Sequence, residues 1–379
     1  MSKILITGGS GFIGSNLAIE LYKLGHEVTV LDNLSNQIHG DNPDKTSPLY
    51  NLIKDKVRFI KGTINNKPLL QEALLEQEII VHYAAETGTG QSMYEIEKYN
   101  HVNIGGTATL LDILANSKHC VKKVVVASSR SIYGEGKYFS KKYGIVYPEH
   151  RNQRDMDQGL FEVSYKSDKQ LEVLATDEDS KIHPSSVYGI TKQVQEQLIM
   201  TVCPSLNIAP VSLRYQNVYG PGQSLSNPYT GILSIFSTLI LQNKSINIFE
   251  DGYESRDFVY ISDVVDATVL AIFNDKASGK IYNVGSGVRT NVKFVVDQLL
   301  KNYETSVPVT ISGNYRLGDI RHNFADLTKI NADLGFSPKV SFEQGIKEFT
   351  KWVQGINLKD IDNKFDDSLK EMKSKGMFK

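Results

Sequence analysis

Six tyrosines in this sequence have a lysine four residues later, a spacing that can turn a phenol into a base. A phenol accepts a hydroxyl proton readily only when a nearby cation lowers its pKa from about 10. Residues four apart on a helix share one face, so the lysine can supply that cation. The chemistry would be oxidation of an alcohol, in which the base takes the hydroxyl proton while a hydride leaves the carbon. The six are Tyr50, Tyr94, Tyr133, Tyr138, Tyr165 and Tyr188.

The surroundings of each pair favour Tyr188 and Lys192. This pair opens a helix-like run, V-Y-G-I-T-K-Q-V-Q-E-Q-L-I-M, and a His-Pro pair can break the chain just before it. Tyr165 lies in an irregular segment, and Tyr133 follows the strand-like Lys123–Ser128 too closely to begin a long helix. We therefore predict that Tyr188 is the base and that the other five tyrosines are solvated at the surface.

A serine pair, Ser128-Ser129, closes that predicted strand. In open α/β sheets the ligand crevice lies beyond the carboxyl ends of the strands. A hydroxyl at this place can hydrogen-bond the substrate oxygen beside the tyrosine. The alternative is a serine that only terminates a strand.

Four glycines near the N-terminus, in I-L-I-T-G-G-S-G-F-I-G, lie between an apolar strand and an amphipathic helix. Gly9, Gly11 and Gly14 fit G-x-G-x-x-G, and Gly8 begins the related G-x-x-G-x-x-G spacing. Such a turn brings backbone amides and a helix N-terminus to a pyrophosphate. Asp32 ends the next predicted strand, where a carboxylate binds the ribose hydroxyls of NAD and repels the 2′-phosphate of NADP. The sequence therefore predicts an NAD site.

The first half of the chain alternates short apolar strands with amphipathic helices, which is typical of βαβ units around a parallel sheet. We predict strands at Lys3–Thr7, Glu27–Asp32, Val57–Lys61, Ile79–Tyr83, Lys123–Ser128 and Ile208–Leu213. We predict helices at Ile13–Leu24, Leu69–Leu75, Val102–Asn116 and Tyr188–Cys203, the last of them ended by Pro204. The fold class expected is α/β, a doubly wound parallel sheet of the Rossmann type with a smaller mixed α/β substrate domain.

The regular alternation fades after about residue 215. Further helices are predicted at Gly231–Leu241 and Val292–Asn302, and further short strands at Ser245–Phe249 and Val307–Ile311. Residues 134–184 form a long excursion rich in Tyr, Lys and Asp, and connections of that length are usually functional or disordered. We expect an NAD-binding domain (1–215 and 255–285), a substrate domain (216–254 and 286–352) and a charged C-terminal tail (353–379) that is a solvated helix or frayed end.

Composition narrows the classes of partner. Lys and Arg number 42 against 43 Asp and Glu, a net charge of −1, which argues against nucleic acid or anionic lipid. Two cysteines are too few for a disulfide framework or a cysteine-rich metal site, and we predict no metal. The longest apolar stretch, Gly231–Leu241, is too short to span a membrane. The start runs directly into a predicted strand, so we expect no secretory signal and a cytoplasmic protein.

From residue 3 to about 352, the chain resembles the extended short-chain dehydrogenase/reductase family. Within that family it resembles the NAD-dependent nucleotide-sugar epimerase/dehydratase branch. The resemblance rests on several separated motifs. They are T-G-G-S-G-F-I-G (7–14), L-D-N-L-S (31–35), H-Y-A-A (82–85), S-S-R-S-I-Y-G (128–134), Y-G-I-T-K (188–192), L-R-Y-Q-N-V-Y-G-P (213–221), R-D-F-V-Y (256–260), Y-N-V-G-S-G (282–287) and G-D-I-R (318–321).

The resemblance implies a role for each matched position. Ser129, Tyr188 and Lys192 take the catalytic roles. NAD would be held by Gly8, Gly11, Phe12, Ile13, Gly14, Asp32, Asn33, Ala84, Ala85 and Asn103, together with Tyr188 and Lys192. The nucleotide-diphosphate sugar would meet Ser129, Arg130, Asn217, Arg256 and Arg321, and arginine forks suit its phosphate oxygens. Thr63 departs from the family pattern, because many relatives carry an aspartate there to contact the adenine amino group.

The reaction type follows from Arg130 and Ser131. The 4,6-dehydratases of the family carry Asp-Glu there, and the decarboxylases usually carry a glutamate at the second position, so dehydration and decarboxylation are disfavoured. What remains is 4-epimerisation, by an isomerase that oxidises C4 transiently with NAD and reduces it again. The stretches at 90–96, 128–138 and 227–236 resemble the dTDP-L-rhamnose 4-epimerase group, which implies a dTDP-6-deoxyhexose substrate and polysaccharide biosynthesis.

Several alternatives stay open. The same residues could serve a 4-ketosugar reductase that consumes NAD(P)H, a UDP-sugar 4-epimerase, or a 3,5- or 2-epimerase. A dinucleotide sensor without catalysis is a different class, but it would have no need of Ser129, Tyr188 and Lys192 together. The family habit of pairing helices predicts a homodimer, with Val102–Asn116 and Tyr188–Cys203 as the candidate helices.

Overall fold

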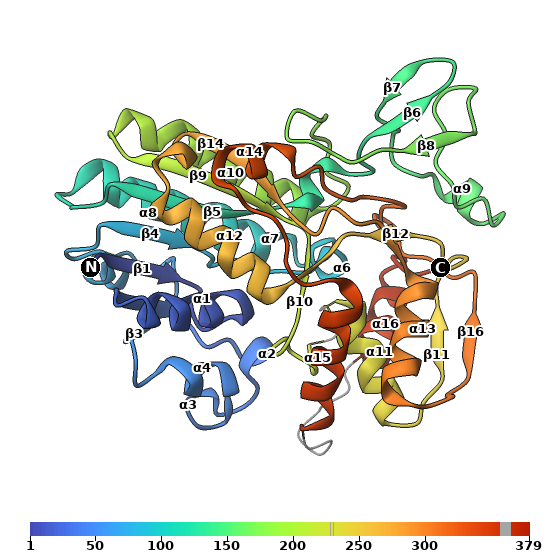
Figure 1. Ribbon diagram of the computed structural model, residues 1–379, viewed down its shortest axis with the longest axis horizontal. Coiled ribbons are helices and arrows are strands. Elements are labelled where there is room, and N and C mark those ends of the chain that lie inside the picture. The colour runs from blue at the N-terminus through green and yellow to red at the C-terminus, as the bar shows by residue number, and fades with distance from the viewer. Residues whose placement is uncertain (228, 230, 357–364) are drawn as a thin grey trace.

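A computed structural model describes residues 1–227, 229, 231–356 and 365–379 (Figure 1). Within them, the largest sheet has the strand order β14-β9-β5-β4-β1-β2-β3, and every pair of neighbours is parallel. The strand order reverses between β1 and β4, where such sheets open a ligand crevice. The predicted Rossmann-type α/β class is confirmed. The strands are β1 (Lys3–Thr7), β2 (Glu27–Asp32), β3 (Arg58–Lys61), β4 (Ile79–His82), β5 (Lys123–Ser129), β9 (Ala209–Tyr215) and β14 (Lys280–Val284).

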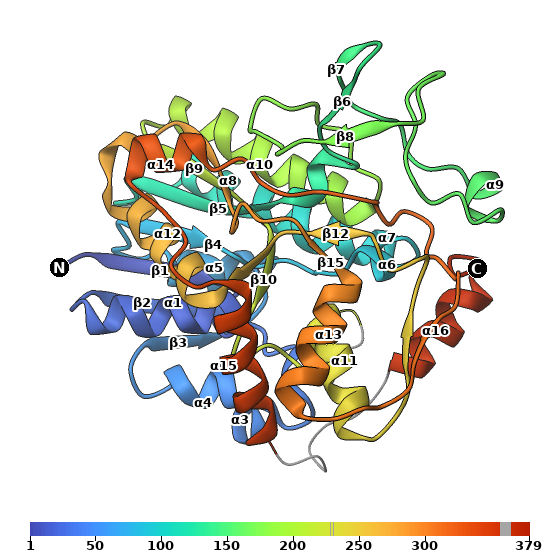
Figure 2. The same ribbon diagram turned by 45° about the vertical axis from the view of Figure 1, so that its right-hand side comes forward.

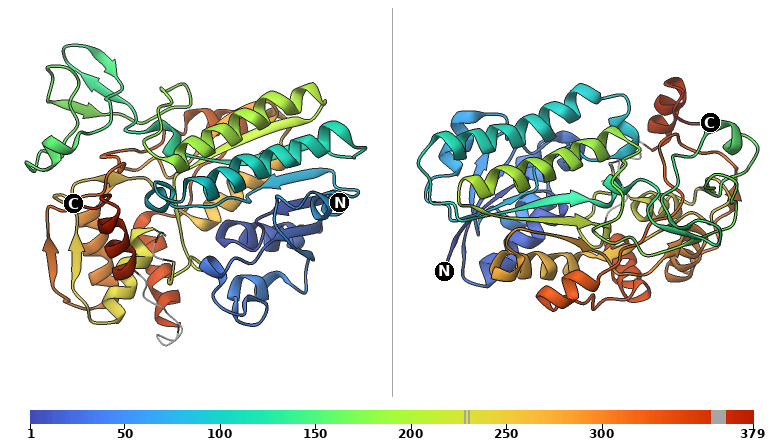
Figure 3. Two further views of the ribbon diagram at one scale, coloured as in Figure 1. Left: turned by 180° about the vertical axis from the view of Figure 1, so that it is seen from behind. Right: turned by 90° about the horizontal axis from the view of Figure 1, so that it is seen from above.

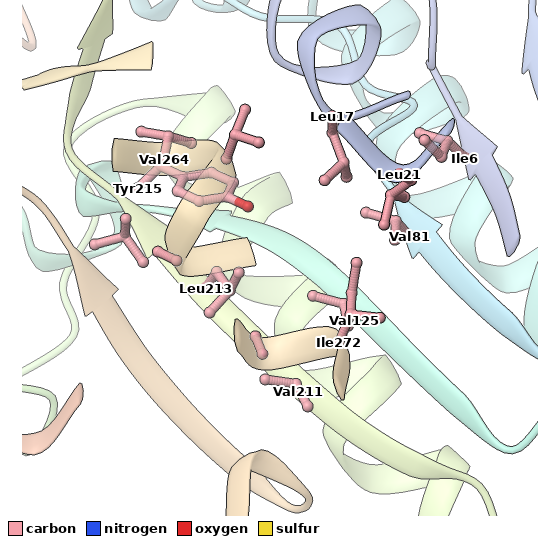
Figure 4. Packing of buried hydrophobic residues seen from close by; sticks show 14 of the residues in the cluster. Ile6, Leu17, Leu21, Val81, Val125, Val211, Leu213, Tyr215, Val264 and Ile272 are labelled. Carbon is pink, nitrogen blue, oxygen red and sulfur yellow. The ribbon is translucent and has the colours of Figure 1, made fainter. Parts of the chain in front are cut away.

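The central strands carry mostly apolar residues because both faces of the sheet are covered. Successive side chains point to opposite faces, so Ile4 and Ile6 enter one hydrophobic core and Leu5 enters the other. Figure 4 shows the first core, in which Leu17 lies near Ile6. The two cores hold the sheet rigid, and its carboxyl edge therefore carries side chains at fixed positions.

Helices cover both faces (Figure 3). One face carries α1 (Phe12–Lys23), α12 (Ile261–Phe273) and α14 (Thr328–Leu334). The other carries α5 (Lys67–Ala73), α8 (Gly106–Asn116) and α10 (Val187–Ser205). The connections hold the short helices α2 (Asn36–His39), α3 (Pro43–Thr46), α4 (Pro48–Ile53), α6 (Thr89–Ser92) and α7 (Ile96–Tyr99).

Helix α10 starts where its sequence predicts and ends slightly later. The Ser186 hydroxyl accepts a hydrogen bond from the backbone N–H of Gly189 at 3.1 Å, which caps the first turn. The expectation that Pro204 ends the helix is wrong by one residue, because the last turn includes it and continues to Ser205. Tyr188 and Lys192 thus stand in the first two turns, next to the carboxyl edge of the sheet.

A second region packs around its own hydrophobic core, which draws on three helices and on strand β11 (Ile246–Ile248), and β11 pairs in parallel with the exposed strand β16 (Val309–Ile311). The helices are α11 (Ile232–Leu241), α13 (Val292–Tyr303) and α15 (Phe342–Gln354). Two strand pairs lie near the junction with the large sheet: β10 (Asn217–Tyr219) with β13 (Phe258–Tyr260), and β12 (Ser255–Arg256) with β15 (Thr290–Asn291). Helix α14, expected in the substrate domain, instead buries Ile330 and Leu334 in the core of the large sheet.

The excursion at 134–184 is folded. It contains an antiparallel sheet in the order β7-β6-β8, which projects beside the second region in Figure 2. Its elements are β6 (Tyr138–Ser140), β7 (Gly144–Val146), α9 (Gln153–Met156) and β8 (Leu171–Val173). No helix among the described residues has the length and apolar character needed to cross a bilayer.

The C-terminal tail is not a solvated end. Residues 353 and 354 complete α15, residues 357–364 lie outside the described residues, and α16 (Phe365–Ser374) packs back onto the second region (Figures 1 and 2). Met372 is 2% exposed and Ser368 is 4% exposed. The high charge of this segment suggested a solvated helix, but one stripe of it is buried, as expected of an amphipathic helix that packs on a core.

Candidate active site

The glycine turn after β1 fits closely against the loop after β4. Gly8 has φ +70°, and a Cβ on it would lie 2.7 Å from the backbone nitrogen of Ala84. A Cβ on Gly14 would lie 2.6 Å from the carbonyl oxygen of Gly8. Both positions therefore require glycine, the first also for its left-handed backbone. The turn places the N-terminus of α1 at the crevice where β1 and β4 diverge.

Asp32 ends β2 and organises the neighbouring loops. Its two carboxylate oxygens accept hydrogen bonds from the backbone N–H groups of Ser10 and Leu34, each at 2.9 Å. The side chain is buried but reaches the wall of the crevice beside Asn33. A carboxylate held there suits the ribose hydroxyls of NAD and repels the extra phosphate of NADP.

A cavity of about 400 Å³ follows this crevice and contains nearly all predicted cofactor positions, and Thr63 as well. The predicted residues in its wall are Gly8, Gly11, Phe12, Ile13, Gly14, Asp32, Asn33, Ala84, Ala85, Tyr188 and Lys192. Ser128, Gln216 and Gln223 also line it, and each has a buried polar atom with no hydrogen-bond partner in the described part of the chain. Buried polar atoms normally have partners, so this wall suits a polar ligand. The cavity therefore fits NAD.

Asn103 is a predicted cofactor position that does not line the cavity. It is fully buried in a π-helical turn, Asn100–Gly105. Its Oδ1 accepts from the backbone N–H of Glu86 at 2.7 Å, and its Nδ2 donates to Thr191 Oγ1 at 2.9 Å. Asn103 thus joins the loop after β4 to helix α10 and positions both.

A second cavity, of about 280 Å³, is lined by the carboxyl end of β5 and by the second region. Ser129 and Tyr188 line both this cavity and the cofactor cavity. The two predicted catalytic hydroxyls therefore stand at the border between two binding spaces. Arg130, Asn217 and Arg256, all predicted to bind substrate, lie in the wall of the second cavity.

The surroundings of Tyr188 pull its pKa in two directions. Burial has the largest effect and leaves the pKa of Tyr188 above its ordinary value, whereas a hydrogen bond with Ser129 and the charge of Arg130 lower it. Ser129 Oγ in turn accepts from the Ser131 hydroxyl at 2.9 Å and from the Ser131 backbone N–H at 3.2 Å. Arg130 is held by Asn217, whose Oδ1 accepts from Arg130 Nε at 2.6 Å. These contacts fix a base, a bridging hydroxyl and a cation together.

Lys192 has a different set of partners from the one expected. Its Nζ donates to Gln195 Oε1 at 2.8 Å, and Gln195 Nε2 lies 2.9 Å from Thr107 Oγ1. Burial lowers the pKa of Lys192 to about 7, opposed by the charge of Glu196. The cation that favours the Tyr188 phenolate in this structure is Arg130, a residue expected only to bind substrate.

We expect replacement of Arg130 by glutamine to move the acid limb of the pH–rate profile to higher pH. A cation stabilises the phenolate and lowers the pKa of Tyr188, so its loss raises that pKa and more alkaline solution is needed to form the base. Arg130→Lys, which keeps a charge, should return the limb toward its original position. The measurement is kcat/KM against pH for the three proteins, and a limb that does not move in Arg130→Gln would contradict this role.

Besides Arg130, two arginines line the second cavity, and they are not the predicted pair of Arg256 and Arg321. Arg256 lines it and is held by the backbone oxygens of Ile320 and Arg321, at 2.7 and 3.0 Å. Arg316 lines it as well, and its Nε donates to Asp319 at 2.8 Å. Arg321, predicted to hold phosphate, is fully buried and does not line the cavity. The motif region contains two arginines five residues apart, and spacing alone does not tell which one faces the ligand.

Arg321 instead fastens the excursion to the second region. Its guanidinium pairs with Glu162 of the excursion at 2.5 Å and with Glu250 and Asp251 at 2.9 and 2.8 Å. Arg151 of the excursion pairs with the same Glu250 at 2.8 Å. Because every guanidinium nitrogen of Arg321 faces a carboxylate, the residue cannot serve as a free phosphate ligand. This burial among carboxylates is why the predicted phosphate-binding role of Arg321 is wrong.

The sequence analysis did not assign a role to Gln216 and misplaced two tyrosines. Gln216 is 5% exposed and lies within the quoted motif at 213–221, which was the signal that could have found it. Tyr133 and Tyr138, expected at the surface, are fully buried, and the Tyr133 hydroxyl accepts a hydrogen bond from Arg214 at 2.7 Å. Their burial depends on residues that are distant in sequence.

We expect Gln216→Leu to stabilise the NAD-free protein and to weaken NAD binding. Both polar atoms of the Gln216 amide are buried without a partner in the described structure, which costs about 1–3 kcal/mol for each unsatisfied group. Leucine removes that cost, but it also removes the groups available to a ligand. Thermal unfolding with and without NAD should show a higher Tm for the NAD-free variant and a smaller NAD-dependent rise. A lower Tm in the NAD-free variant would refute the explanation.

Comparison with known proteins agrees with this geometry. The sequence matches the NAD dependent epimerase/dehydratase family over residues 4–152 and 164–285. It is 35% identical to a dTDP-L-rhamnose 4-epimerase of Burkholderia thailandensis, over 93% of this chain and 94% of that protein. It is 30% identical to a putative UDP-glucose 4-epimerase of Methanocaldococcus jannaschii, over 93% of this chain and 99% of that protein.

A solved structure gives the same assignment. The UDP-glucuronic acid 4-epimerase from Bacillus cereus, in complex with UDP-glucuronic acid and NAD, superposes with a TM-score of 0.75 at 26% identity. The match covers 93% of this chain and 99% of that one. Together with the glycine turn, the cofactor cavity and the Ser129–Tyr188 border, these similarities show that the chain belongs to the NAD-dependent epimerase/dehydratase family.

Proposed function

We propose that this protein is a nucleotide-sugar 4-epimerase, an isomerase that uses NAD, and that its substrate is a dTDP-6-deoxyhexose such as dTDP-L-rhamnose. The observation that carries the reaction type is the position of Ser129 and Tyr188, which line the cofactor cavity and the second cavity at once. The relative that acts on dTDP-L-rhamnose supports the choice of sugar. Two neighbouring functions within the family are disfavoured by specific residues.

Those residues are Arg130 and Ser131, which occupy the positions of the acid/base couple in dehydratases. Arg130 is held by Asn217, and Ser131 donates its hydroxyl to Ser129. A guanidinium and a serine hydroxyl cannot readily protonate one sugar oxygen and deprotonate a neighbouring carbon. The site therefore retains the base and the bridging hydroxyl that reversible oxidation at one carbon requires. It lacks the acid/base couple that dehydration requires.

In the proposed mechanism Tyr188, as phenolate, removes the proton of the sugar 4-hydroxyl and later returns it. Ser129 bridges the phenol and the sugar oxygen, and Arg130 stabilises the phenolate. NAD, when bound, supplies a reversible hydride acceptor for C4. Because hydride and proton leave and return in equal number, no external reductant is consumed. Lys192 and Asp32 are the residues that would hold the ribose side of the cofactor.

Inversion at C4 requires the oxidised sugar to present its other face before it is reduced. Arg256 and Arg316 line the substrate cavity and would anchor the diphosphate, so the sugar ring can turn while its phosphate end stays fixed. Glu250, Glu254 and Asp319 share this wall. Among them, burial raises the pKa of Glu254 to about 7.

The test is incubation of the purified protein with dTDP-, UDP- and GDP-linked sugars, followed by proton NMR of the C4 position. We expect a dTDP-6-deoxyhexose to be converted to its C4 epimer with no net change in absorbance at 340 nm. Stoichiometric consumption of NAD(P)H would identify a 4-ketosugar reductase instead. Conversion of UDP-sugars alone would keep the reaction and overturn the proposed substrate.

We also propose that the protein is a homodimer that pairs through helices α8 and α10. These helices lie side by side on one face of the sheet (Figure 3), and Ile190 on α10 is 47% exposed. Light scattering should give twice the chain mass. Ile190→Glu should convert the dimer to a monomer. If the wild-type protein is itself a monomer, the proposed dimer is wrong.

A further inference from the structure

The C-terminal segment contacts the substrate cavity although it lies far from the site in sequence. Phe365, at the start of α16, is part of the wall of the second cavity. Sequence patterns described this segment only as a charged tail. In the structure, Phe365 of this segment lines the same cavity as Ser129, Tyr188 and the arginines.

One contact lies against Gly90, in the short helix α6 of the loop after β4. Met372 is 2% exposed, and a Cβ built on Gly90 would lie 3.1 Å from its Sδ. Gly90 itself lines the cavity. Met372 does not line it, so it can influence the cavity only by holding α16 and the Gly90 loop together.

A second contact joins α16 to Tyr94 and Tyr229. The hydroxyls of Tyr94 and Tyr229 lie 2.5 Å apart, and each lies near Glu371 Oε2, at 3.3 and 3.2 Å. Tyr229 lines the cavity. Tyr94 and Tyr229 belong to two of the stretches, 90–96 and 227–236, that distinguish this sequence within its family.

The last residues form a third contact. The backbone N–H of Tyr315 donates to the carbonyl oxygen of Lys379 at 3.1 Å, and that of Leu317 donates to Met377 at 3.0 Å. The ring of Phe378 lies 5.1 Å from that of Phe249. Tyr315 and Phe249 both line the cavity. All three contacts thus end on loops that form the cavity wall.

We propose that α16 completes the sugar side of the substrate cavity and retains the sugar while its oxidised ring turns. Phe365 is the wall residue, and Met372 and Glu371 are positioning residues that hold α16 to the loops of Gly90 and Tyr229. The proposal rests on the proposed function, because an epimerase, unlike a 4-ketosugar reductase, must hold a ketosugar between two hydride transfers. A ketosugar that escapes leaves one hydride on the cofactor and one proton on Tyr188.

The experiment compares Phe365→Ala and Met372→Asp with wild type, and uses Lys370→Ala as the matched control on the same helix. The Lys370 side chain is 78% exposed and pairs only with exposed Asp367 among its described ion-pair partners. In both α16 variants we expect KM for the nucleotide sugar to rise about tenfold, the factor that corresponds to one lost apolar contact of about 1.4 kcal/mol. The kcat should change by less than about twofold, because Tyr188 and Ser129 are untouched.

A second readout follows the sugar that escapes. Absorbance at 340 nm should build up during turnover in the variants and stay flat in wild type and Lys370→Ala, since reduced cofactor remains when a ketosugar leaves. Limited proteolysis should cut α16 sooner in Met372→Asp than in the control. If Met372→Asp does not fold, Phe365→Ala and Glu371→Gln carry the test.

The outcomes separate this inference from the proposed function. If wild type epimerises a nucleotide sugar and the α16 variants match it in KM and absorbance, the inference is wrong and the proposed function stands. If wild type epimerises none of the sugars, calorimetric binding of dTDP- and UDP-sugars still tests α16. Weaker sugar binding in Phe365→Ala would then support the role of Phe365 in the cavity wall, and unchanged binding would overturn that role.

Discussion

Replacement of Tyr188 by phenylalanine should lower kcat by about 10²–10⁴-fold, the range that a positioned acid/base group contributes. Phenylalanine keeps the ring that lines both cavities and removes only the hydroxyl that exchanges the proton. The structure gives that hydroxyl a hydrogen bond with Ser129 and a stabilising charge from Arg130. Fold and cofactor binding should persist, since the backbone N–H of Tyr188 still donates to Ser92 at 3.0 Å.

A matched control exists in Tyr165, which has the same lysine spacing but lies in the small antiparallel sheet region. Tyr165→Phe should leave kcat unchanged. Turnover is followed by proton NMR at C4, and circular dichroism verifies the fold. Near-wild-type turnover in folded Tyr188→Phe would remove the base from the mechanism.

The second large effect concerns the stability of the catalytic helix. Glu196 on α10 and Arg214 on β9 form a buried pair, with Arg214 Nη2 at 2.6 Å from Glu196 Oε1 and Nε at 3.0 Å from Oε2. The side chains are 4% and 2% exposed. Glu196→Leu leaves a buried guanidinium without its carboxylate, so we expect the free energy of unfolding to fall by about 3–5 kcal/mol.

The double variant Glu196→Leu, Arg214→Met tests the cause. It removes both charges together, and apolar replacements of buried pairs are often neutral or stabilising, so most of the lost stability should return. Urea unfolding of the two variants and wild type gives the comparison. A double variant as unstable as Glu196→Leu would show that the cost comes from packing instead of an unpaired charge.

The regular part of the fold could be predicted because its signals are local. Strands such as Glu27–Asp32 are short β-branched and apolar segments between polar residues, and the predicted bounds of this strand agree with the structure. The glycine motif is equally local in sequence, and a Cβ on Gly14 would meet the carbonyl oxygen of Gly8, whereas the close approach at Gly8 itself is to the distant Ala84. Tyr188 was separable from five competing tyrosines because it alone opened a long helix.

Predictions failed where a side chain's surroundings come from distant segments. Arg321 and Arg316 look alike in sequence, yet Glu162 and Asp251 enclose the first and leave the second at the cavity wall. The charged tail looked solvated because Met372 finds its buried place only against Gly90, which lies far away along the chain.

The sequence by itself determined the parallel sheet and the dinucleotide turn and singled out Tyr188 as the predicted base, since each of these signals depends on backbone geometry or periodicity within about twenty residues. Only the tertiary structure decided that Arg316 lines the second cavity while Arg321 is buried among carboxylates, that the charge of Arg130 lowers the pKa of Tyr188, and that Phe365 of α16 borders this cavity. Those decisions rest on desolvation and charge pairing between residues up to several hundred positions apart, and no local pattern encodes them.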